Sequence, residues 1–221
     1  MNRRLELTRA RIVALIIGLP LTLAAIGAFA MHTLGDLAAG TYPVRIDLPA
    51  HGRAVTVSID AGDLRLTSAA DGQIRLHGVA QYSLFRPSVT SQAAGPGIVL
   101  TSRCRSITQC AFNYHLDLPA GVAANLTDGS GDITASGLLN RDLTAVSHSG
   151  NITLRFMVVP DHVDLTTSFG DVTLVLPRGG AVYRVDAPAP FGTSTIRVPT
   201  SPKSTHVLTV TDTSGSITIT N

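Results

Sequence analysis

The chain has 221 residues, of which 44% are hydrophobic and only 14% charged, and its formal net charge is +2. Residues 1–31 carry four arginines and one glutamate, so the basic balance belongs to this leader, and the remainder has a net charge of −1. The 5% aromatic content, the absence of Trp and the lack of a Lys/Arg cluster in the remainder argue against a nucleic-acid-binding surface.

Residues 1–11 form a basic N-terminus, and the twenty residues 12–31 contain no charge. A helix rises 1.5 Å per residue, so this stretch can cross a hydrocarbon core of about 30 Å. We therefore predict a transmembrane signal-anchor helix, with the N-terminus cytoplasmic and the C-terminal domain extracytoplasmic, because arginines favour the cytoplasmic side. A cleaved signal peptide stays open as an alternative, since Ala28-Phe29-Ala30 has the form of a cleavage site.

Residues 32–43 are predicted to be a tether, and residues 44–221 an extracytoplasmic domain. Alternating apolar residues flank Gly62 on both sides: Val55, Val57, Leu64 and Leu66. A step of two is the period of a β-strand, so this segment indicates strand, turn, strand. Half of the pattern returns after Gly72, and we predict residues 55–76 to be the first turns of a stack. Residues 85–97, rich in Pro, Gly, Ser and Thr, are predicted to be an exposed loop.

Cys104 and Cys110 are the only cysteines of the chain. Apart from His115 there is no nearby ligand set, so a structural zinc site lacks its four ligands. In an oxidising compartment, a close pair of cysteines predicts a disulfide that closes a small loop. Two free thiols remain the alternative.

The last hundred residues repeat one pattern five times, and each copy is centred on a glycine: Gly131, Gly150, Gly170, Gly192 and Gly215. Alignment on these glycines gives four columns, at seven and five residues before the glycine and at two and four residues after it. Nineteen of the twenty column positions are apolar, and Ser194 is the exception. The step of two within each half again indicates strand, turn, strand.

Stacked copies would join each column into a continuous core, as in a β-solenoid. No stretch after Met31 keeps apolar residues at helical spacing for three turns. The sequence therefore predicts an all-β domain, a single-stack β-solenoid of roughly 20-residue repeats and about seven to eight turns, behind one transmembrane helix.

The residue three positions after each repeat glycine is always a threonine: Thr134, Thr153, Thr173, Thr195 and Thr218. Threonine suits a solvent-facing strand, because it is β-branched and polar. The alternative interpretation is functional, because such a column is also a surface ladder of hydroxyl groups about 4.8 Å apart, suited to a glycan or another polymer.

The chain lacks the common catalytic, phosphate-binding and metalloprotease motifs, so we predict no catalytic residue, no cofactor and no metal site. Calcium at Asp128 and Asp132 is a minor alternative, because the repeat does not hold the calcium-binding form. The rival to a non-enzymatic protein is a polysaccharide-acting β-helix enzyme that uses Asp164 and Asp186, which we expect to be neighbours in one outward column.

The turns Ser130–Ile133 and Ser149–Ile152, which read Ser-Gly-Asp-Ile and Ser-Gly-Asn-Ile, resemble those of a bacterial putative-adhesin family with a β-strand-repeat domain of unknown function. This family is often found behind a single membrane segment, and the resemblance covers about Val44 to Asn221. It implies attachment at the cell surface, and it supplies no catalytic residues. We therefore predict a non-enzymatic protein that presents a binding or scaffolding surface, with cell-envelope glycan or protein as a partner. The repeat at Gly192 departs from the pattern, because Ala187-Pro188-Ala189-Pro190 and Ser194 replace the usual residues.

The chain stops on the strand pair of residues 209–221, which has no following helix or charged cap. Open strand edges pair with other chains unless something covers them. We therefore expect homo-oligomers, or a docked partner strand, at the C-terminal edge strand.

Overall fold

The computed structural model describes residues 20–23, 25–27, 39–50, 54–94, 97–105 and 109–221. Contacts divide the chain into two compact units, Met1–Ala39 and Gly40–Asn221. In the first unit, residues 20–23 and 25–27 are helical. No helix among the described residues has the length and apolar character needed to span a membrane. The predicted basic N-terminus, most of the predicted membrane segment and most of the tether lie outside the described residues.

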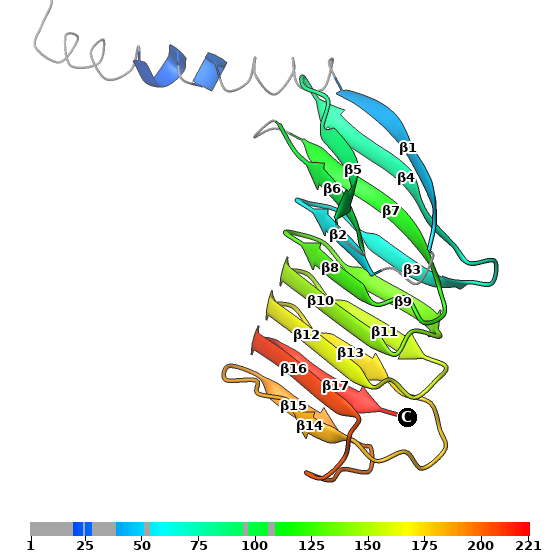
Figure 1. Ribbon diagram of the computed structural model, residues 1–221. Helices are drawn as coiled ribbons and strands as arrows, with labels where there is room; N and C mark the ends of the chain where they lie inside the picture. Colours follow the sequence, from blue (N-terminus) through cyan, green and yellow to red (C-terminus); the bar gives the residue numbers. More distant parts are fainter. Residues whose placement is uncertain (1–19, 24, 28–38, 51–53, 95–96, 106–108) are drawn as a thin grey trace, which may run out of the picture. The chain divides into compact units, whose positions relative to one another are not determined.

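The second unit is built of strands in its described part, so the predicted all-β class is confirmed (Figure 1). The strands are β1 (Ala39–Pro49), β2 (Val55–Ile59), β3 (Leu64–Ala69), β4 (Gln73–Ser83), β5 (Ser88–Ala94), β6 (Gly97–Arg103), β7 (Cys110–Pro119), β8 (Ala124–Asp128), β9 (Ile133–Leu138), β10 (Asp142–Ser149), β11 (Ile152–Phe156), β12 (His162–Phe169), β13 (Val172–Val175), β14 (Arg184–Asp186), β15 (Thr193–Ile196), β16 (Val207–Ser214) and β17 (Ser216–Thr220).

The strands form two sheets, and each glycine turn carries the chain from one sheet to the other (Figure 1). Sheet A has the order β1-β4-β7-β3-β9-β11-β13-β17-β15, and sheet B has the order β14-β16-β12-β10-β8-β2-β6-β5. We call a strand of sheet B, its turn and the following strand of sheet A a rung. Neighbouring rungs pair in parallel, and the predicted columns are in register. Leu143, for example, lies between Ala124 and Val163, and all three are buried between the sheets.

The turns stack so closely that they require glycine. Gly150 has a φ of 153°, and a Cβ atom built there would lie 2.0 Å from the carbonyl oxygen of Gly131. That contact is far shorter than any real Cβ makes, and the positive φ is unfavourable for residues with a side chain. The recurring glycine is therefore a condition of the rung spacing.

The rungs do not follow one another in chain order at the N-terminal end, which differs from the prediction. The rung β2–β3 lies between β6–β7 and β8–β9, because β3 pairs with both β7 and β9. β3 and β4 are consecutive in the chain but do not pair, and β7 lies between them in sheet A. Ile74 and Leu76 are consequently in β4, which pairs antiparallel with β7, and they are not half of a parallel turn.

The segment predicted as a loop over residues 85–97 contains strand β5, so this prediction is wrong for Ser88–Ala94. β5 pairs antiparallel with β6 along seven residues. Serine, threonine and glutamine on a strand that packs only one face look like loop composition, which explains the error.

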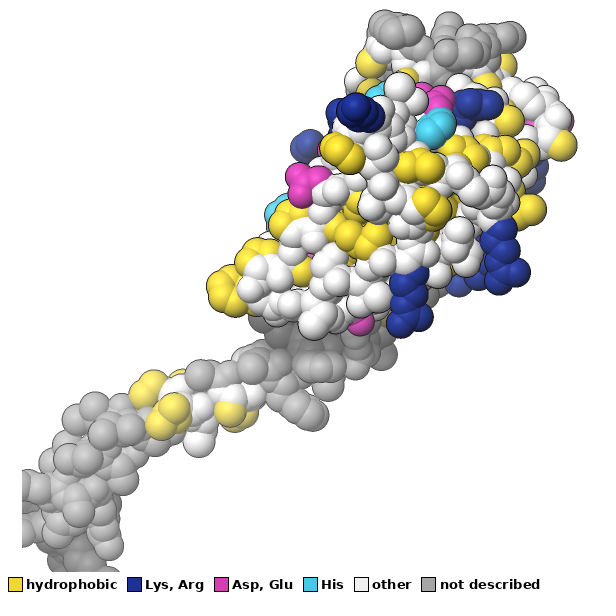
Figure 2. Space-filling view, turned by 90° about the horizontal axis from the view of Figure 1, so that it is seen from below, with side chains coloured by type: hydrophobic (Ala, Val, Ile, Leu, Met, Phe, Trp, Pro, Cys, Tyr) yellow, Lys and Arg dark blue, Asp and Glu magenta, His cyan; other side chains and the backbone are white. Residues whose placement is uncertain are grey.

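The expectation that the last strand pair is an open edge is also wrong. β17 lies between β13 and β15, and β16 lies between β12 and β14. The outermost rung at this end is β14–β15, the copy whose sequence departs from the repeat. Its column residue Ile196 is 42% exposed, and Phe191 in its turn is 80% exposed. Figure 2 looks onto this end of the domain, where hydrophobic side chains lie among other uncharged groups, with charged side chains and histidines around them. An end rung packs on one side only, so it can hold Ser194 in an apolar column.

Candidate binding surfaces

The structure brings the five predicted threonines together on the outer face of sheet A. They are in register across five neighbouring strands, in the order Thr134, Thr153, Thr173, Thr218 and Thr195. Thr153 is exposed and the other four are half-buried. At a strand spacing of about 4.8 Å, the row extends over about 19 Å. We call these five residues the threonine row.

The threonine row continues into basic residues at the β3 end. Arg65 is in register with Thr134 on one side and with His115 on the other, and His115 faces His77. The two imidazole rings stack with their centroids 4.9 Å apart. His115 Nε2 lies 2.9 Å from the hydroxyl of Thr67, which donates to a carboxylate oxygen of Asp117. Sequence reasoning missed this extension, although Arg65 stands three residues after Gly62, at the position that the threonines occupy in later repeats.

The polar residues that follow each turn glycine hold neighbouring turns together. The backbone N–H of Asn151 donates to Asp132 Oδ1, that of Asp171 to Asn151 Oδ1, and that of Ser216 to Asp171 Oδ1, each at 2.8 Å. This chain of contacts gives the aspartates a structural role. Within the described residues, no group of three or more His, Cys, Asp or Glu side chains is placed to hold a metal ion.

Asp164 and Asp186 are not neighbours, which corrects the expectation behind the enzyme alternative. Thr209 of β16 is in register with both and separates them. Two strand spacings put them about 9.6 Å apart. Both are exposed on the outer face of sheet B, and neither side chain makes a hydrogen bond or ion pair with another described residue. The expectation failed because β16, which comes later in the chain, pairs with both β12 and β14 and lies between them.

Two aspartates are buried at the turn end of the core, three residues before a turn glycine. Asp128 and Asp212 both have 0% exposure. Burial raises the pKa of Asp128 to about 6. The hydrogen bond that the Ser130 backbone N–H donates to it lowers this pKa, and the nearby carboxylates of Asp63 and Asp132 raise it. Burial also raises the pKa of Asp212.

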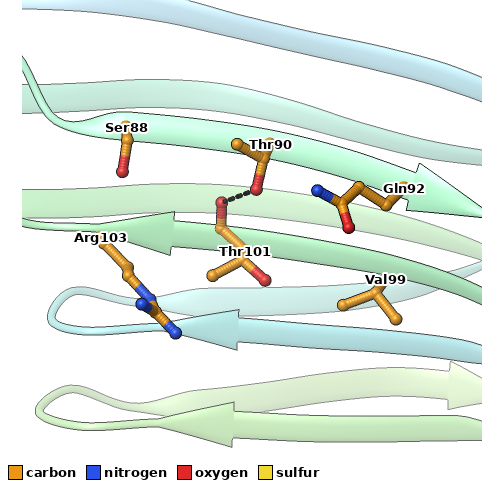
Figure 3. Close-up of a pocket in the computed structure, with 6 residues that line it drawn as sticks. All are labelled: Ser88, Thr90, Gln92, Val99, Thr101 and Arg103. Atoms are coloured by element: carbon orange, nitrogen blue, oxygen red, sulfur yellow. Dashed lines mark hydrogen bonds between the residues drawn. The ribbon is translucent and has the colours of Figure 1, made fainter.

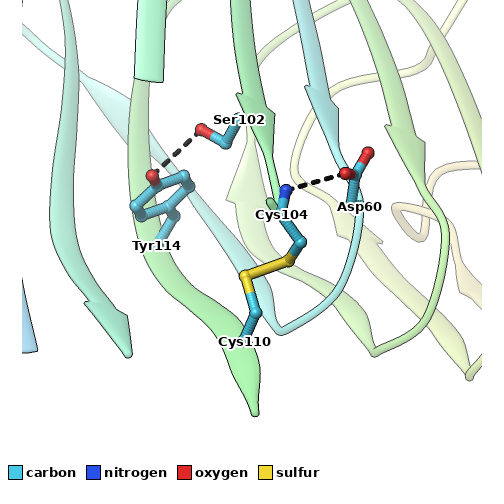
Figure 4. The surroundings of a disulfide bond; sticks show 5 residues. All are labelled: Asp60, Ser102, Cys104, Cys110 and Tyr114. Atoms are coloured by element: carbon cyan, nitrogen blue, oxygen red, sulfur yellow. Dashed lines mark hydrogen bonds between the residues drawn. A yellow bond between two sulfur atoms is a disulfide. The ribbon is translucent and has the colours of Figure 1, made fainter. Parts of the chain in front are cut away.

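Cys104 and Cys110, the predicted pair, are joined by a disulfide (Figure 4). The bond links the end of β6 in sheet B to the start of β7 in sheet A. The backbone N–H of Cys104 donates to Asp60 Oδ2 at 2.8 Å. On the same two strands, the hydroxyls of Ser102 and Tyr114 lie 3.0 Å apart. Burial raises the pKa of Tyr114 to about 12. The disulfide therefore links the two sheets next to the β5–β6 hairpin.

A hollow of about 320 Å³ lies on the outer face of that hairpin (Figure 3). Three cross-strand pairs line it: Ser88 with Arg103, Thr90 with Thr101, and Gln92 with Val99. Sequence reasoning missed this site, because it treated half of the hairpin as a loop. The alternation of Val99, Thr101 and Arg103 was the available signal.

A second row of hydroxyl groups runs across sheet B, also unnoticed in the sequence. In spatial order it consists of Thr90, Thr101, Ser58, Thr127, Val146, Thr166 and Thr211, of which only Val146 lacks a hydroxyl. Thr127, Thr166 and Thr211 each stand four residues before a turn glycine, directly after the apolar column at five residues before it. This recurring position was the available signal for the row.

Comparison with known proteins places these features in a family. The family model described as Toastrack DUF4097 matches residues 46–220. A solved structure of a putative cell adhesion protein from Clostridium sporogenes is similar, with a TM-score of 0.61 and 13% identity over 82% of this chain and 99% of that one. A putative adhesin from Bacteroides fragilis gives a TM-score of 0.40 and 14% identity over 81% of this chain and 97% of that one. The comparison with curated proteins finds no match.

Proposed function

Because the chain belongs to the Toastrack DUF4097 family, we propose that it is a membrane-anchored, extracytoplasmic protein whose β-sheet faces bind cell-envelope material, without enzymatic activity. We assign the binding surface to the outer face of sheet A and the ligand to a cell-envelope glycan.

The observation that carries this proposal is the threonine row. Its hydroxyl groups can each donate and accept a hydrogen bond, and they repeat at about 4.8 Å along a flat face. A polymer with repeating hydroxyl groups can contact several of them at once, so that individually weak contacts add up. Arg65 and the stacked His77–His115 pair extend the same row and add donors at one end.

Three observations support the placement of the β-sheet domain on the extracytoplasmic side of the membrane. The uncharged stretch of residues 12–31 follows four arginines. The Cys104–Cys110 disulfide suits an oxidising compartment. The similar structure from Clostridium sporogenes is that of a putative cell adhesion protein, which agrees with a role at the cell surface.

The exposure of Asp164 and Asp186 supports a binding protein over a glycan-cleaving enzyme. Acid and base must act on one glycosidic bond from a shared cleft, and these two exposed carboxylates lie on a flat face with Thr209 between them. Turnover of a cell-wall or capsular glycan that is lost in Asp164→Asn or Asp186→Asn would contradict the non-enzymatic proposal.

The binding proposal is tested with the full-length chain in detergent and purified cell-wall glycan in a co-sedimentation assay. Replacing Thr153, Thr173 and Thr218 by Val keeps the shape of each side chain and removes its hydroxyl, so we expect binding to fall at least tenfold. The matched control replaces Thr127, Thr166 and Thr211 of sheet B by Val. Equal binding by the two triple variants would contradict the assignment to sheet A.

The anchor and the orientation are tested by protease treatment of intact cells. We expect the domain to be cut from outside, while a tag fused before Met1 stays protected and in the membrane fraction. Recovery of the chain without residues 1–31 would instead show the cleaved signal peptide. Protection of the domain in intact cells, with cutting only after lysis, would contradict the orientation.

A further inference from the structure

We propose that the hollow on the β5–β6 hairpin binds an acidic sugar residue, with Arg103 pairing with the carboxylate of the sugar. This site lies on sheet B, so it is separate from the threonine row and does not depend on the function proposed for that row.

The lining of the hollow is built for hydrogen bonding. Five of its six side chains carry a hydroxyl, an amide or a guanidinium group, and Val99 supplies the only apolar contact. Val99 and Thr101 are half-buried at the β6 side, whereas Thr90, Gln92 and Arg103 are exposed at the rim. Figure 3 shows the side chains of Ser88, Thr90 and Gln92 spaced along β5 opposite those of β6.

The size and the chemistry of this hollow fit a carbohydrate. Its volume of about 320 Å³ is at the lower end of the range for small-molecule sites. Hydroxyl and amide groups both donate and accept, as the hydroxyl groups of a sugar require. The Val99 side chain offers a small surface for the C–H groups of a sugar ring. A purely apolar ligand would leave these polar groups without partners, which costs free energy.

The charge of the hollow selects an anionic form of that sugar. Arg103 is the only charged residue in the lining, and no hydrogen bond or ion pair joins its guanidinium group to another described residue. The carboxylate of Asp60, at the end of the adjacent strand β2, accepts from the backbone N–H of Cys104. A guanidinium group has a planar fork of donors that matches a carboxylate in two parallel hydrogen bonds.

The arrangement is also held in place before a ligand arrives. Ser88 is in register with Arg103, and Thr90 with Thr101, along an antiparallel ladder of seven residue pairs. Directly after Arg103, the disulfide at Cys104 fixes the end of β6 to β7. Because the strands are fixed, little ordering of the backbone is needed on binding, which favours affinity.

The test uses the full-length chain in detergent, with a galacturonate tetramer as the acidic probe and a galactose tetramer as the neutral one, in calorimetric titrations. We expect the acidic tetramer to bind at least tenfold more tightly than the neutral one. Arg103→Gln should remove this preference, and Thr101→Val should weaken both probes. Arg155→Gln changes an exposed arginine on sheet A and should leave the preference intact.

Competition with inorganic phosphate separates a sugar site from a general anion site. We expect phosphate to displace the acidic tetramer only at concentrations at least tenfold higher. Equal competition would overturn the assignment to a sugar, and unchanged binding in Arg103→Gln would overturn the site itself. The valine variants of the threonine row should bind the acidic tetramer normally, so this proposal and the proposed function can fail independently.

Discussion

In two rungs, the side chain three positions before the turn glycine donates a hydrogen bond to the neighbouring rung. The hydroxyl of Ser147 donates to the carbonyl oxygen of Gly131 at 3.3 Å, and that of Thr167 donates to Gly150 at 3.2 Å. Asp128 and Asp212 occupy the same position in their rungs. A Cβ atom built on Gly215 would lie 2.6 Å from Asp212 Oδ2 and 2.1 Å from the carbonyl oxygen of Gly170, so both oxygens border the same turn glycine.

A protonated carboxyl group can donate to that carbonyl oxygen as the hydroxyls do, whereas a carboxylate cannot. Neither Asp128 Oδ2 nor Asp212 Oδ2 has a hydrogen-bond partner as a bare acceptor. Together with the raised pKa, this favours the neutral acid at Asp128 below about pH 6. Burial shifts the pKa of Asp212 in the same direction.

The first prediction is that the folded domain loses stability as the pH rises through 6. Folded Asp128 has a pKa of about 6, against 3.8 ordinarily, so the folded state holds more protons than the unfolded state between these values. The unfolding free energy is therefore highest below about pH 4 and falls as pH rises, by about 3 kcal/mol for this group. Asp212 acts in the same direction. Urea unfolding from pH 4 to pH 8 measures this slope.

Asp128→Asn supplies an N–H donor that does not titrate, so the slope should become shallower. Asp164→Asn is the control, because Asp164 is exposed and its side chain makes no hydrogen bond or ion pair with another described residue. A slope that is the same in Asp128→Asn and in the wild type would exclude Asp128 as its source.

The second prediction concerns the stacked turns. In Gly150→Ala the new methyl group would meet the carbonyl oxygen of Gly131, so we expect a loss of at least about 2 kcal/mol in unfolding free energy. Gly72→Ala is the matched control. Gly72 also has a positive φ, of 68°, but no atom lies within 4 Å of its added Cβ. This variant should lose only about 1 kcal/mol. Similar losses in the two variants would mean that backbone conformation alone, and not rung spacing, requires the glycine.

At the scale of the element, a rung is stabilised by the rungs on both sides of it. Leu154 of β11 is fully buried between β9 and β13, and Ile196 of β15 is 42% exposed on the end rung. The third prediction is that Leu154→Ala lowers the unfolding free energy by about 2–5 kcal/mol, whereas Ile196→Ala lowers it by about 1 kcal/mol or less. Thermal unfolding followed by circular dichroism separates the two. A larger loss in Ile196→Ala would show that something covers the end rung.

The strands were predictable from the sequence because the signal for them is local. Val163 and Leu165, for example, alternate inward within one strand, and Gly170 marks the turn a few residues later. The order of the rungs was not predictable, because every rung presents the same kind of apolar column to its neighbours. The departures of the copy at Gly192 from the pattern, such as Ser194 in an apolar column, were the available sign that this copy packs on one side only. The threonine row followed from the columns, whereas the hollow at Arg103 depends on pairing between β5 and β6.

At the scale of the whole domain, the rung β14–β15 is attached to the others through β16–β17. β14 pairs with β16, and β15 pairs with β17. The fourth prediction is that a chain truncated after His206 keeps the rungs up to β12–β13 but not a folded segment 184–196. Limited proteolysis with mass spectrometry should then find cuts in this segment, which the full chain resists. A truncated chain that resists cutting there would show that β14–β15 can take the vacant position beside β12–β13.

The insertion of β16–β17 has a consequence for the newly made chain. Synthesis proceeds at about 5–20 residues per second, so β14 leaves the ribosome about one to four seconds before β16, the strand that joins it to the stack. During this interval the growing chain presents two unpaired sheet edges, at β12–β13 and at β14–β15. The same situation arises earlier, when β3 must wait for β7 and β9. Emergence of β16–β17 therefore joins the two edges, and a chain that stalls before Val207 leaves both edges open for chaperones and proteases to recognise.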